Sequence, residues 1–268
     1  MTGWIVYDAQ GAERNGWFLS SFIQTFARYG VDLQKKIVSG VADFAELTRS
    51  PLPDFAIVRT IAPDINRFLE ENSVLVFNNY QTAKVANNKW LTHLLCRDLQ
   101  IPTMKTELLS SSPSLSFPFV IKSLDGHGGT EVFLINDRQG LDEMLAKVNT
   151  SNFLAQEFCS SPGKDMRVYV LGGKVICGIL RSSDNDFRSN FSLGGQVCVG
   201  EVSQAQTNAI EKLFGALGFD FVGVDFILHN GEWVLNEIED VVGTRMLYRC
   251  TDIDIVDLYV RHILTRLP

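Results

Sequence analysis

The sequence predicts an α/β fold divided into two or three subdomains. In the first 80 residues, short apolar strands alternate with segments of helical periodicity, which is typical of an open sheet with mostly parallel strands. Further along, pairs of apolar runs are separated by glycine-containing turns, which indicates antiparallel hairpins. The length of 268 residues exceeds the commonest size of a single domain, so more than one compact unit is expected.

Residues 1–79 are expected to form the open parallel sheet. A polar loop, Asp8–Gly16, is expected after the first strand, and Gly30 is placed to end the helix that follows. That helix carries apolar side chains at helical spacing, namely Phe18, Phe22, Ile23 and Phe26. The remaining elements are expected to be strands at Trp4–Tyr7, Val31–Val38, Phe55–Val58 and Val74–Phe77 and a helix at Ile65–Glu71.

Residues 80–158 are expected to form a second unit around a glycine-rich turn. Lys84–Leu99 is helical in pattern and is followed closely by Pro102. Two strands, Phe119–Lys122 and Glu131–Ile135, flank the turn at residues 125–129. A helix near Leu141–Val148 and a strand at Phe153–Phe158 complete the unit before a polar loop at Ser160–Lys164.

Residues 159–268 are expected to form a third unit built from hairpins. Met166–Leu171 and Lys174–Arg181 are joined by Gly172 and Gly173, a strong hairpin signal. After a polar, glycine-rich segment at 184–195, Ser203 can cap a helix that Gly218 ends. A last amphipathic helix is expected at Ile255–Leu267.

The segment Val224–Asp240 carries acidic residues inside strands that otherwise look buried. It reads as a hairpin around Asn230 and Gly231, and Glu237 and Glu239 are two apart, so they share a face. Asp225 joins that face if the loop is odd in length, whereas a strict two-residue turn pairs it with Asn236. Three converging carboxylates repel one another unless a cation holds them, and Mg²⁺ prefers such oxygen ligands. The alternative is an edge hairpin with solvated acids.

Lys122 closes an apolar strand immediately before the glycine-rich turn. A buried lysine needs an anion, for which nucleotide phosphate is a candidate; the alternative is an edge lysine that reaches water. Gly126, Gly128 and Gly129 allow backbone N–H groups to approach phosphate oxygens, although the segment could be only a hairpin turn. Neither a dinucleotide-binding nor a P-loop pattern is present.

Two further groups of residues are candidates for ligand binding. Gln156, Glu157 and Phe158 lie at a strand end where one lobe meets the next, and their backbone groups could form hydrogen bonds with the edge of an adenine base. The second group is cationic and consists of Arg167, Arg181 and Arg188, with Asn190 nearby. These arginines could either pair with the acids or bind a phosphoryl or carboxylate group.

Composition argues against several classes of partner. A hydrophobic content of 46% and a charged content of 21% are ordinary for a globular protein, and no apolar run is long enough to cross a membrane. The net charge of −7 argues against a general nucleic-acid surface. No signal peptide is expected at the N-terminus. Five cysteines without metal-ligand spacing favour reduced thiols and a cytoplasmic location.

Taken in order, these motifs resemble those of the ATP-grasp ligases. The similarity is to the branch that includes the ribosomal-protein-S6 glutamate ligase and the LysX-type amino-acid ligases, and it covers nearly the whole chain. The matching positions are Lys89 near a helix start, Lys122 with its glycine loop, Gln156–Phe158, Asp165 with Arg167, the segment Asp186–Asn190, and Asp225 with Glu237. The motif order and the segment Asp186–Asn190 are the most specific parts.

The resemblance implies an ATP-grasp fold with three domains. A small N-terminal α/β domain (1–79) would precede a central lobe (80–158) and a C-terminal lobe (159–268), and the two α+β lobes would clasp ATP. The implied ATP-binding residues are Lys89 and Lys122 at the phosphates, the loop glycines Gly126, Gly128 and Gly129, Gln156, Glu157 and Phe158 at adenine, and Asp165 at ribose.

The same resemblance implies catalytic and metal-binding residues. Arg188, Asn190 and Arg167 would act at the reacting phosphoryl or carboxylate group. Asp225, Glu237 and Glu239 would hold Mg²⁺, with Mn²⁺ as an alternative. Glu239 stands where the family usually has Asn, and the segment after it lacks the usual turn with Pro and Gly. These departures leave the substrates open.

The implied activity is ATP-dependent formation of a peptide or amide bond through an acyl phosphate. The partners would be ATP, an amino acid or other carboxylate, and an amine acceptor of open identity; homo-oligomerisation is also left open. One alternative is an ATP-grasp kinase or acyl-phosphate former without an amine acceptor. Another is a non-catalytic nucleotide-binding module.

Overall fold

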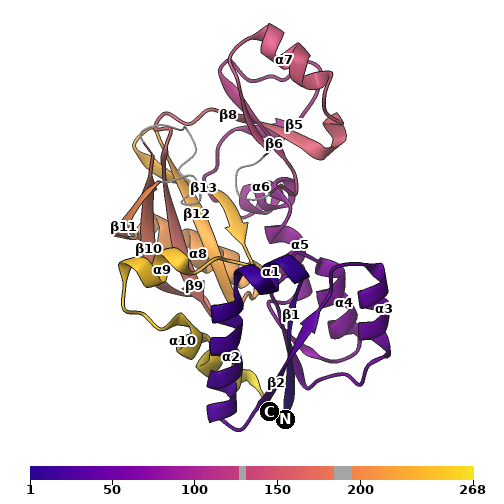
Figure 1. Ribbon diagram of the computed structural model, residues 1–268. Helices are drawn as coiled ribbons and strands as arrows, with labels where there is room; N and C mark the ends of the chain where they lie inside the picture. Colours follow the sequence, from indigo (N-terminus) through magenta and orange to yellow (C-terminus); the bar gives the residue numbers. More distant parts are fainter. Residues whose placement is uncertain (127–130, 184–194) are drawn as a thin grey trace.

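The computed structural model describes residues 1–126, 131–183 and 195–268. Its strands form three sheets, and Figure 1 shows them as three separate groups along the chain. Gly128, Gly129, Arg188 and Asn190, which the sequence singled out, lie outside the described residues. In the part that is described, no helix combines the length and hydropathy needed to cross a bilayer.

The first sheet is wholly parallel, which confirms the prediction for the N-terminal part. Its strand order is β2-β1-β3-β4. The strands are β1 (Thr2–Tyr7), β2 (Asp32–Ile37), β3 (Phe55–Val58) and β4 (Leu75–Phe77), and the helices between them are α1 (Ala9–Arg14), α2 (Gly16–Arg28), α3 (Val41–Arg49) and α4 (Pro63–Glu71). The carboxyl ends of the strands lie at one edge of the sheet, where ligands commonly bind in open α/β folds.

Two helices of this part were not expected from the sequence. The supposed loop at 8–16 contains α1, because Asp8 accepts a hydrogen bond from the Gly11 N–H at 2.6 Å and caps the helix. Helix α3 carries Val41, Phe44 and Leu47 at a spacing of three residues, so its helical periodicity is present in the sequence and was missed.

The single helix expected at Lys84–Leu99 is two helices, α5 (Tyr80–Ala86) and α6 (Lys89–Asp98). The Asn79 side chain caps α5 by accepting from Thr82 N, and Asn88 caps α6 by accepting from Leu91 N. These asparagines satisfy N–H groups at each helix start, which favours a break over a continuous helix. The prediction was therefore wrong here, and the break places Lys89 in the first turn of α6.

The second sheet has the order β5-β8-β6-β7 and is antiparallel throughout. It has its own core, in which Phe119 and Ile121 pack against Leu141 and Met144 of the covering helix. The elements are β5 (Thr106–Leu108), β6 (Phe119–Ser123), β7 (Val132–Ile135), α7 (Arg138–Leu145), a short 3-10 helix η1 (Thr150–Asn152) and β8 (Phe153–Glu157).

The third sheet has the order β11-β10-β9-β12-β13 and is also antiparallel. Ser203 and Gln206 form a capping box at the start of α8, and Gly218 ends that helix at φ +60°, as predicted. The elements are β9 (Lys164–Leu171), β10 (Lys174–Ser182), β11 (Gln196–Gly200), α8 (Gln204–Leu217), β12 (Phe221–His229), β13 (Glu232–Glu239), α9 (Arg245–Cys250) and α10 (Ile255–Arg266).

One hydrophobic core joins the first sheet to the third. Ile5 and Phe22 from the N-terminal part lie in the same cluster as Phe221 of β12 and Tyr259 of α10. The rings of Phe22 and Tyr259 meet edge to face with centroids 5.7 Å apart. The N-terminal sheet is thereby held against the C-terminal sheet. The predicted domain boundaries at residues 79 and 158 stay a prediction.

Asn78, directly after β4, strengthens this junction with buried hydrogen bonds. Its Oδ1 accepts from the N–H groups of Asp220 and Phe221 at 2.7 and 2.9 Å, and its Nδ2 donates to Phe221 O at 2.8 Å. Buried hydrogen bonds of this kind orient two elements more strictly than apolar contact does. The space between the carboxyl ends of the first sheet and the end of β13 is therefore well defined.

Candidate active site

The β12–β13 hairpin combines a two-residue turn with a bulge. Asn230 and Gly231 both have positive φ, at +52° and +83°, as the tightest hairpin turns require. The pairing is regular from His229–Glu232 to Phe226–Leu235, and then shifts so that Asp225 lies opposite Glu237. Asn236 is the extra residue of a β-bulge. The turn is therefore the strict two-residue turn, and the bulge nevertheless places Asp225 opposite Glu237 instead of Asn236.

Three carboxylates converge beside this bulge. Oxygen atoms of Asp225, Glu237 and Glu239 all lie within 4.8 Å of one another. Asp225 is 1% exposed, whereas Glu237 and Glu239 are half-buried. The alternative of three separate, solvated acids is thus wrong for Asp225.

Arginines supply positive charge to part of this cluster. Arg167 donates from Nε and Nη2 to the two oxygens of Asp225 at 2.8 and 2.7 Å, and to Glu239 at 2.6 Å. Arg181 joins Asp225 at 2.7 Å and also binds both oxygens of Asp165. Of the two roles that the sequence allowed these arginines, pairing with the acids is the one observed.

The charges of the cluster act on one another strongly. Burial alone would raise the pKa of Asp225, but Arg167 and Arg181 hold it below its usual value. Burial raises the pKa of Glu239, and the negative charges of Asp225 and Glu237 add to that effect against the attraction of Arg167. Additional positive charge near Glu237 and Glu239 would therefore be favourable.

Lys89 and Lys122 lie close to strand β13 of the same hairpin. Lys89 Nζ is 3.6 Å from Glu237 Oε2 and also donates to the backbone carbonyl of Gly126. Lys122 Nζ donates to Gln156 Oε1 at 2.6 Å and to Asn236 Oδ1 at 3.0 Å. Burial lowers the pKa of Lys122 to about 8, and the charge of Lys89 contributes in the same direction. Neither lysine simply reaches into water.

The residues predicted to contact adenine and ribose form hydrogen bonds with other residues of the protein. The Glu157 N–H donates to Lys105 O at 2.9 Å, and Gln156 holds Lys122 by its side chain. Asp165 is buried against Arg181. The roles of Gln156, Glu157, Phe158 and Asp165 in nucleotide binding stay predictions.

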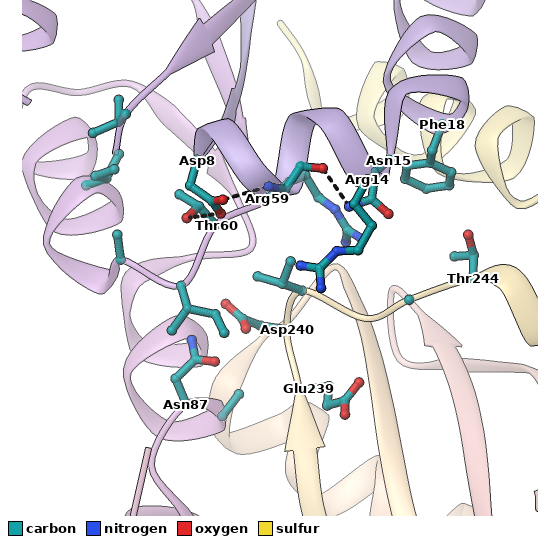
Figure 2. A pocket seen from close by; sticks show the side chains of 18 of the residues that line it. Asp8, Arg14, Asn15, Phe18, Arg59, Thr60, Asn87, Glu239, Asp240 and Thr244 are labelled. Atoms are coloured by element: carbon teal, nitrogen blue, oxygen red, sulfur yellow. Dashed lines mark hydrogen bonds between the residues drawn. The ribbon is translucent and has the colours of Figure 1, made fainter. Parts of the chain in front are cut away.

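A large pocket of about 1220 Å³ begins at this cluster and extends to the first sheet. Lys89, Arg167, Glu237 and Glu239 line one end of it. The other end is lined by residues that follow the parallel strands or belong to nearby helices, and Figure 2 labels several of them, including Asp8, Arg14, Arg59, Thr60, Asp240 and Thr244. Sequence reasoning missed these residues. Asp8 and Arg59 could have been noticed, because each directly follows a predicted parallel strand.

The family is decided by the match to the model of the RimK-like ATP-grasp domain, which covers residues 86–263. The chain belongs to the RimK-like ATP-grasp family. Its N-terminal 85 residues, which carry Arg14 and Arg59, lie outside the matched region.

Two relatives and a solved structure are similar to this chain over most of its length. The protein MG011 of Mycoplasma genitalium is 28% identical over 98% of this chain and 92% of its own length. A probable alpha-L-glutamate ligase of Haemophilus ducreyi is 27% identical over 80% of this chain and 74% of its own length. The crystal structure of D-alanine–D-alanine ligase from Bacillus anthracis complexed with ATP superimposes with a TM-score of 0.76 at 16% identity, covering 98% and 96% of the two chains. The RimK-like chain therefore has the ATP-grasp fold.

The acidic cluster of this RimK-like chain fits a hard divalent cation. Its donors are all carboxylate oxygens, and their mutual distances allow them to share one ion. Glu237 and Glu239 are the more accessible donors, since both oxygens of Asp225 already accept from arginines. Burial is the main cause of the raised pKa of Glu239, and a cation would relieve the repulsion by Asp225 and Glu237 that adds to it.

Proposed function

We propose that the protein is an ATP-dependent carboxylate–amine ligase that forms a peptide or amide bond. The observation that carries this proposal is that Lys89 lies 3.6 Å from Glu237 and Lys122 is hydrogen-bonded to Asn236, both beside the cluster of Asp225, Glu237 and Glu239. Lys89, Glu237 and Glu239 also line the large pocket. Phosphoryl transfer requires positioned positive charge more than it requires a protein nucleophile. Family membership supports the same reaction class.

The proposed reaction has two steps. A carboxylate oxygen attacks the γ-phosphorus of ATP, ADP leaves, and an acyl phosphate forms. The amine then attacks the acyl carbon, a tetrahedral intermediate loses phosphate, and the amine gives up its proton. The first step turns a poor leaving group into phosphate, so the second step proceeds without a covalent enzyme intermediate.

Among the described residues, the lysines are proposed to bind phosphate and Arg167 to position the carboxylates. Lys89 and Lys122 are proposed to exchange their contacts with Glu237, Gln156 and Asn236 for phosphate oxygens of ATP. Arg167 holds Asp225 and Glu239 in a single arrangement through three hydrogen bonds. Mg²⁺ bound at these acids would neutralise charge on the transferring phosphoryl group.

The remaining predicted residues extend this proposal. Gly126, Gly128 and Gly129 are proposed to cover the phosphates, and Arg188 and Asn190 to act at the reacting group. Gln156, Glu157, Phe158 and Asp165 are proposed to contact the nucleoside. Mn²⁺ in place of Mg²⁺, a homo-oligomer and a cytoplasmic location stay predictions.

A kinase or acyl-phosphate former without an amine acceptor is the first alternative, and a non-catalytic nucleotide-binding module is the second. A pure binding module has no need of two lysines and three carboxylates around one phosphate position, which favours an enzyme. Because one relative is named a probable alpha-L-glutamate ligase, we include glutamate among the proposed substrates.

A phosphate-release screen tests this function. Pairs of carboxylic acids and amines, with glutamate on both sides, are incubated with the protein, ATP and Mg²⁺. A ligase releases ADP and phosphate steadily only when both an acid and an amine are present. Release that needs the acid alone favours the kinase, and tight ATP binding without any turnover favours the module.

A further inference from the structure

Arg59 is a buried cation without an acidic partner at the far end of the pocket. It directly follows β3, is 7% exposed and lines the cavity. Its Nη2 donates to the carbonyl of Val242 at 2.7 Å, and its Nε is buried without any hydrogen-bond partner. In the described part of the chain, no carboxylate lies within ion-pair distance of its guanidinium. A buried, unpaired charge is costly, so the site is built for an anion that comes from outside.

Arg14 adds a second cation to the same end of the pocket. It comes from α1, lines the same cavity, and Figure 2 shows its side chain pointing down from α1 into the space that Arg59 also faces. Asp8 lines the same end, but it forms no ion pair with either arginine among the described residues; its oxygens accept from Gly11 N at 2.6 Å and Thr60 Oγ1 at 3.0 Å. Among the described residues, Arg14 forms no ion pair either.

Asp240 is another acid that lines this pocket. It is buried, its Oδ1 has no hydrogen-bond partner, and the charge of Arg59 acts on it without a direct ion pair. Asp240 accepts no hydrogen bond from Arg59 among the described residues, so N–H groups of the guanidinium stay available to a ligand.

The cavity connects this cationic end with the reacting end. Lys89, Arg167, Glu237 and Glu239 line the same space of about 1220 Å³ as Arg14 and Arg59. Because a single cavity reaches both ends, one bound molecule of sufficient length can extend between them.

We propose that the acid substrate is a diacid, with one carboxylate activated beside Glu237 and Glu239 and the second held by Arg59 and Arg14. This inference rests on the proposed ligase function. Arg59 and Arg14 are specificity-determining residues in this proposal. Both lie in the N-terminal part that the family match does not include. A guanidinium binds a carboxylate through two parallel hydrogen bonds, which a neutral amide cannot reproduce.

The experiment compares each diacid with its own half-amide. Succinate, glutarate and adipate, and the half-amide of each, are supplied with ATP, Mg²⁺ and hydroxylamine. Hydroxylamine attacks the acyl phosphate, releases phosphate and gives a hydroxamate that is measured directly. We expect kcat/KM to be at least about tenfold higher for one diacid than for its half-amide.

Single-residue variants test whether Arg59 and Arg14 cause the preference for the diacid over its half-amide. Arg59→Gln should lower the preference by about ten- to a hundredfold, and Arg14→Gln by several-fold, with the kcat for the half-amide largely kept. Arg14 is exposed, so its replacement does not threaten the fold. Arg49→Gln changes an exposed arginine of α3 outside the pocket and should leave the preference unchanged.

Two results separate this inference from the proposed function. Equal use of diacids and half-amides, or an unchanged preference in both Arg59→Gln and Arg14→Gln, overturns the diacid proposal while the ligase function stands. If none of these acids yields hydroxamate, the phosphate-release screen decides the ligase function, and calorimetry with glutarate and its half-amide in the presence of Mg²⁺ and ADP decides the anion site. Tighter binding of glutarate that Arg14→Gln weakens supports the site, and equal binding overturns it.

Discussion

Asp225 lies directly opposite Glu237 across the β12–β13 hairpin, although the two-residue turn alone would pair it with Asn236. The bulge at Asn236 shifts the pairing by one residue and brings the two carboxylates together, with Glu239 beside them. The same residue accepts a hydrogen bond from Lys122 at 3.0 Å. One local irregularity thus assembles the acidic cluster and connects it to a lysine of the second sheet.

Replacing Arg167 should make the stability of the protein depend on Mg²⁺. Arg167→Met leaves Asp225 and Glu239 without their shared cation, at a cost of roughly 3 to 5 kcal/mol for a broken buried pair. A divalent cation at the cluster would replace part of the lost charge. The melting temperature of the variant should therefore rise more on adding Mg²⁺, relative to EDTA, than that of the unmodified protein.

The matched control for this comparison is Arg138→Met. That arginine pairs with Asp142 on the exposed face of α7, away from the cluster. Its replacement should change the melting temperature little, with or without Mg²⁺. An Arg167→Met variant that gains nothing from Mg²⁺ would argue against a cation site at Asp225, Glu237 and Glu239.

ATP affinity should fall as the pH rises through about 8, because Lys122 then loses its proton. The pKa of Lys122 is lowered, so the positive charge needed for phosphate is present below that value and lost above it. In Lys122→Met, ATP should bind at least about tenfold more weakly at pH 7 and without this pH dependence. Calorimetry at pH 6.5 to 9.5 measures both effects, and an unchanged affinity at pH 7 removes Lys122 from the phosphate site.

Asp240 should make the metal-free protein less stable as the pH rises. Burial raises the pKa of Asp240 to about 7 against the opposing effects of Asn87 and Arg59. Its contribution to stability is complete below the unfolded value near 4 and is lost as the pH rises through about 7. Asp240→Asn should flatten that part of the pH dependence in urea unfolding with EDTA present. An identical slope for both proteins between pH 5 and 8 would contradict the shift.

Much of the fold followed from local patterns, and the differences have local causes. The parallel sheet, the Gly172–Gly173 hairpin and the capped helix α8 were predicted because strand alternation, turn residues and caps all act over a few residues. The break before Lys89 was missed because helical periodicity runs through Asn87 and Asn88.

The acidic cluster of the candidate site was predictable because its residues lie in one contiguous motif. Asp225, Glu237 and Glu239 are close in sequence, so their convergence could be expected from the hairpin. Arg59 and Asp240 are 181 positions apart in the sequence, and no local pattern indicates that the charge of Arg59 acts on Asp240. The pairing of Asp165 with Arg181 likewise depends on the register of β9 and β10.

Arg188→Lys should separate a catalytic role from a structural one. The variant keeps the charge but loses the planar donor pair, so we expect kcat to fall by about a hundredfold with ATP binding little changed. A purely structural arginine would instead lower the melting temperature and leave most of the rate. Measuring kcat and melting temperature on the same variant distinguishes the two, and a near-normal rate removes Arg188 from the catalytic set.

The most direct test of the account follows oxygen from the acid to phosphate. The acid that gives the highest phosphate release is labelled with ¹⁸O in its carboxylate and incubated with ATP, Mg²⁺ and the amine. An acyl phosphate predicts that each amide formed transfers one ¹⁸O atom to inorganic phosphate, with ADP as the other product. Label recovered in AMP, or amide formed with unlabelled phosphate, would contradict activation through an acyl phosphate.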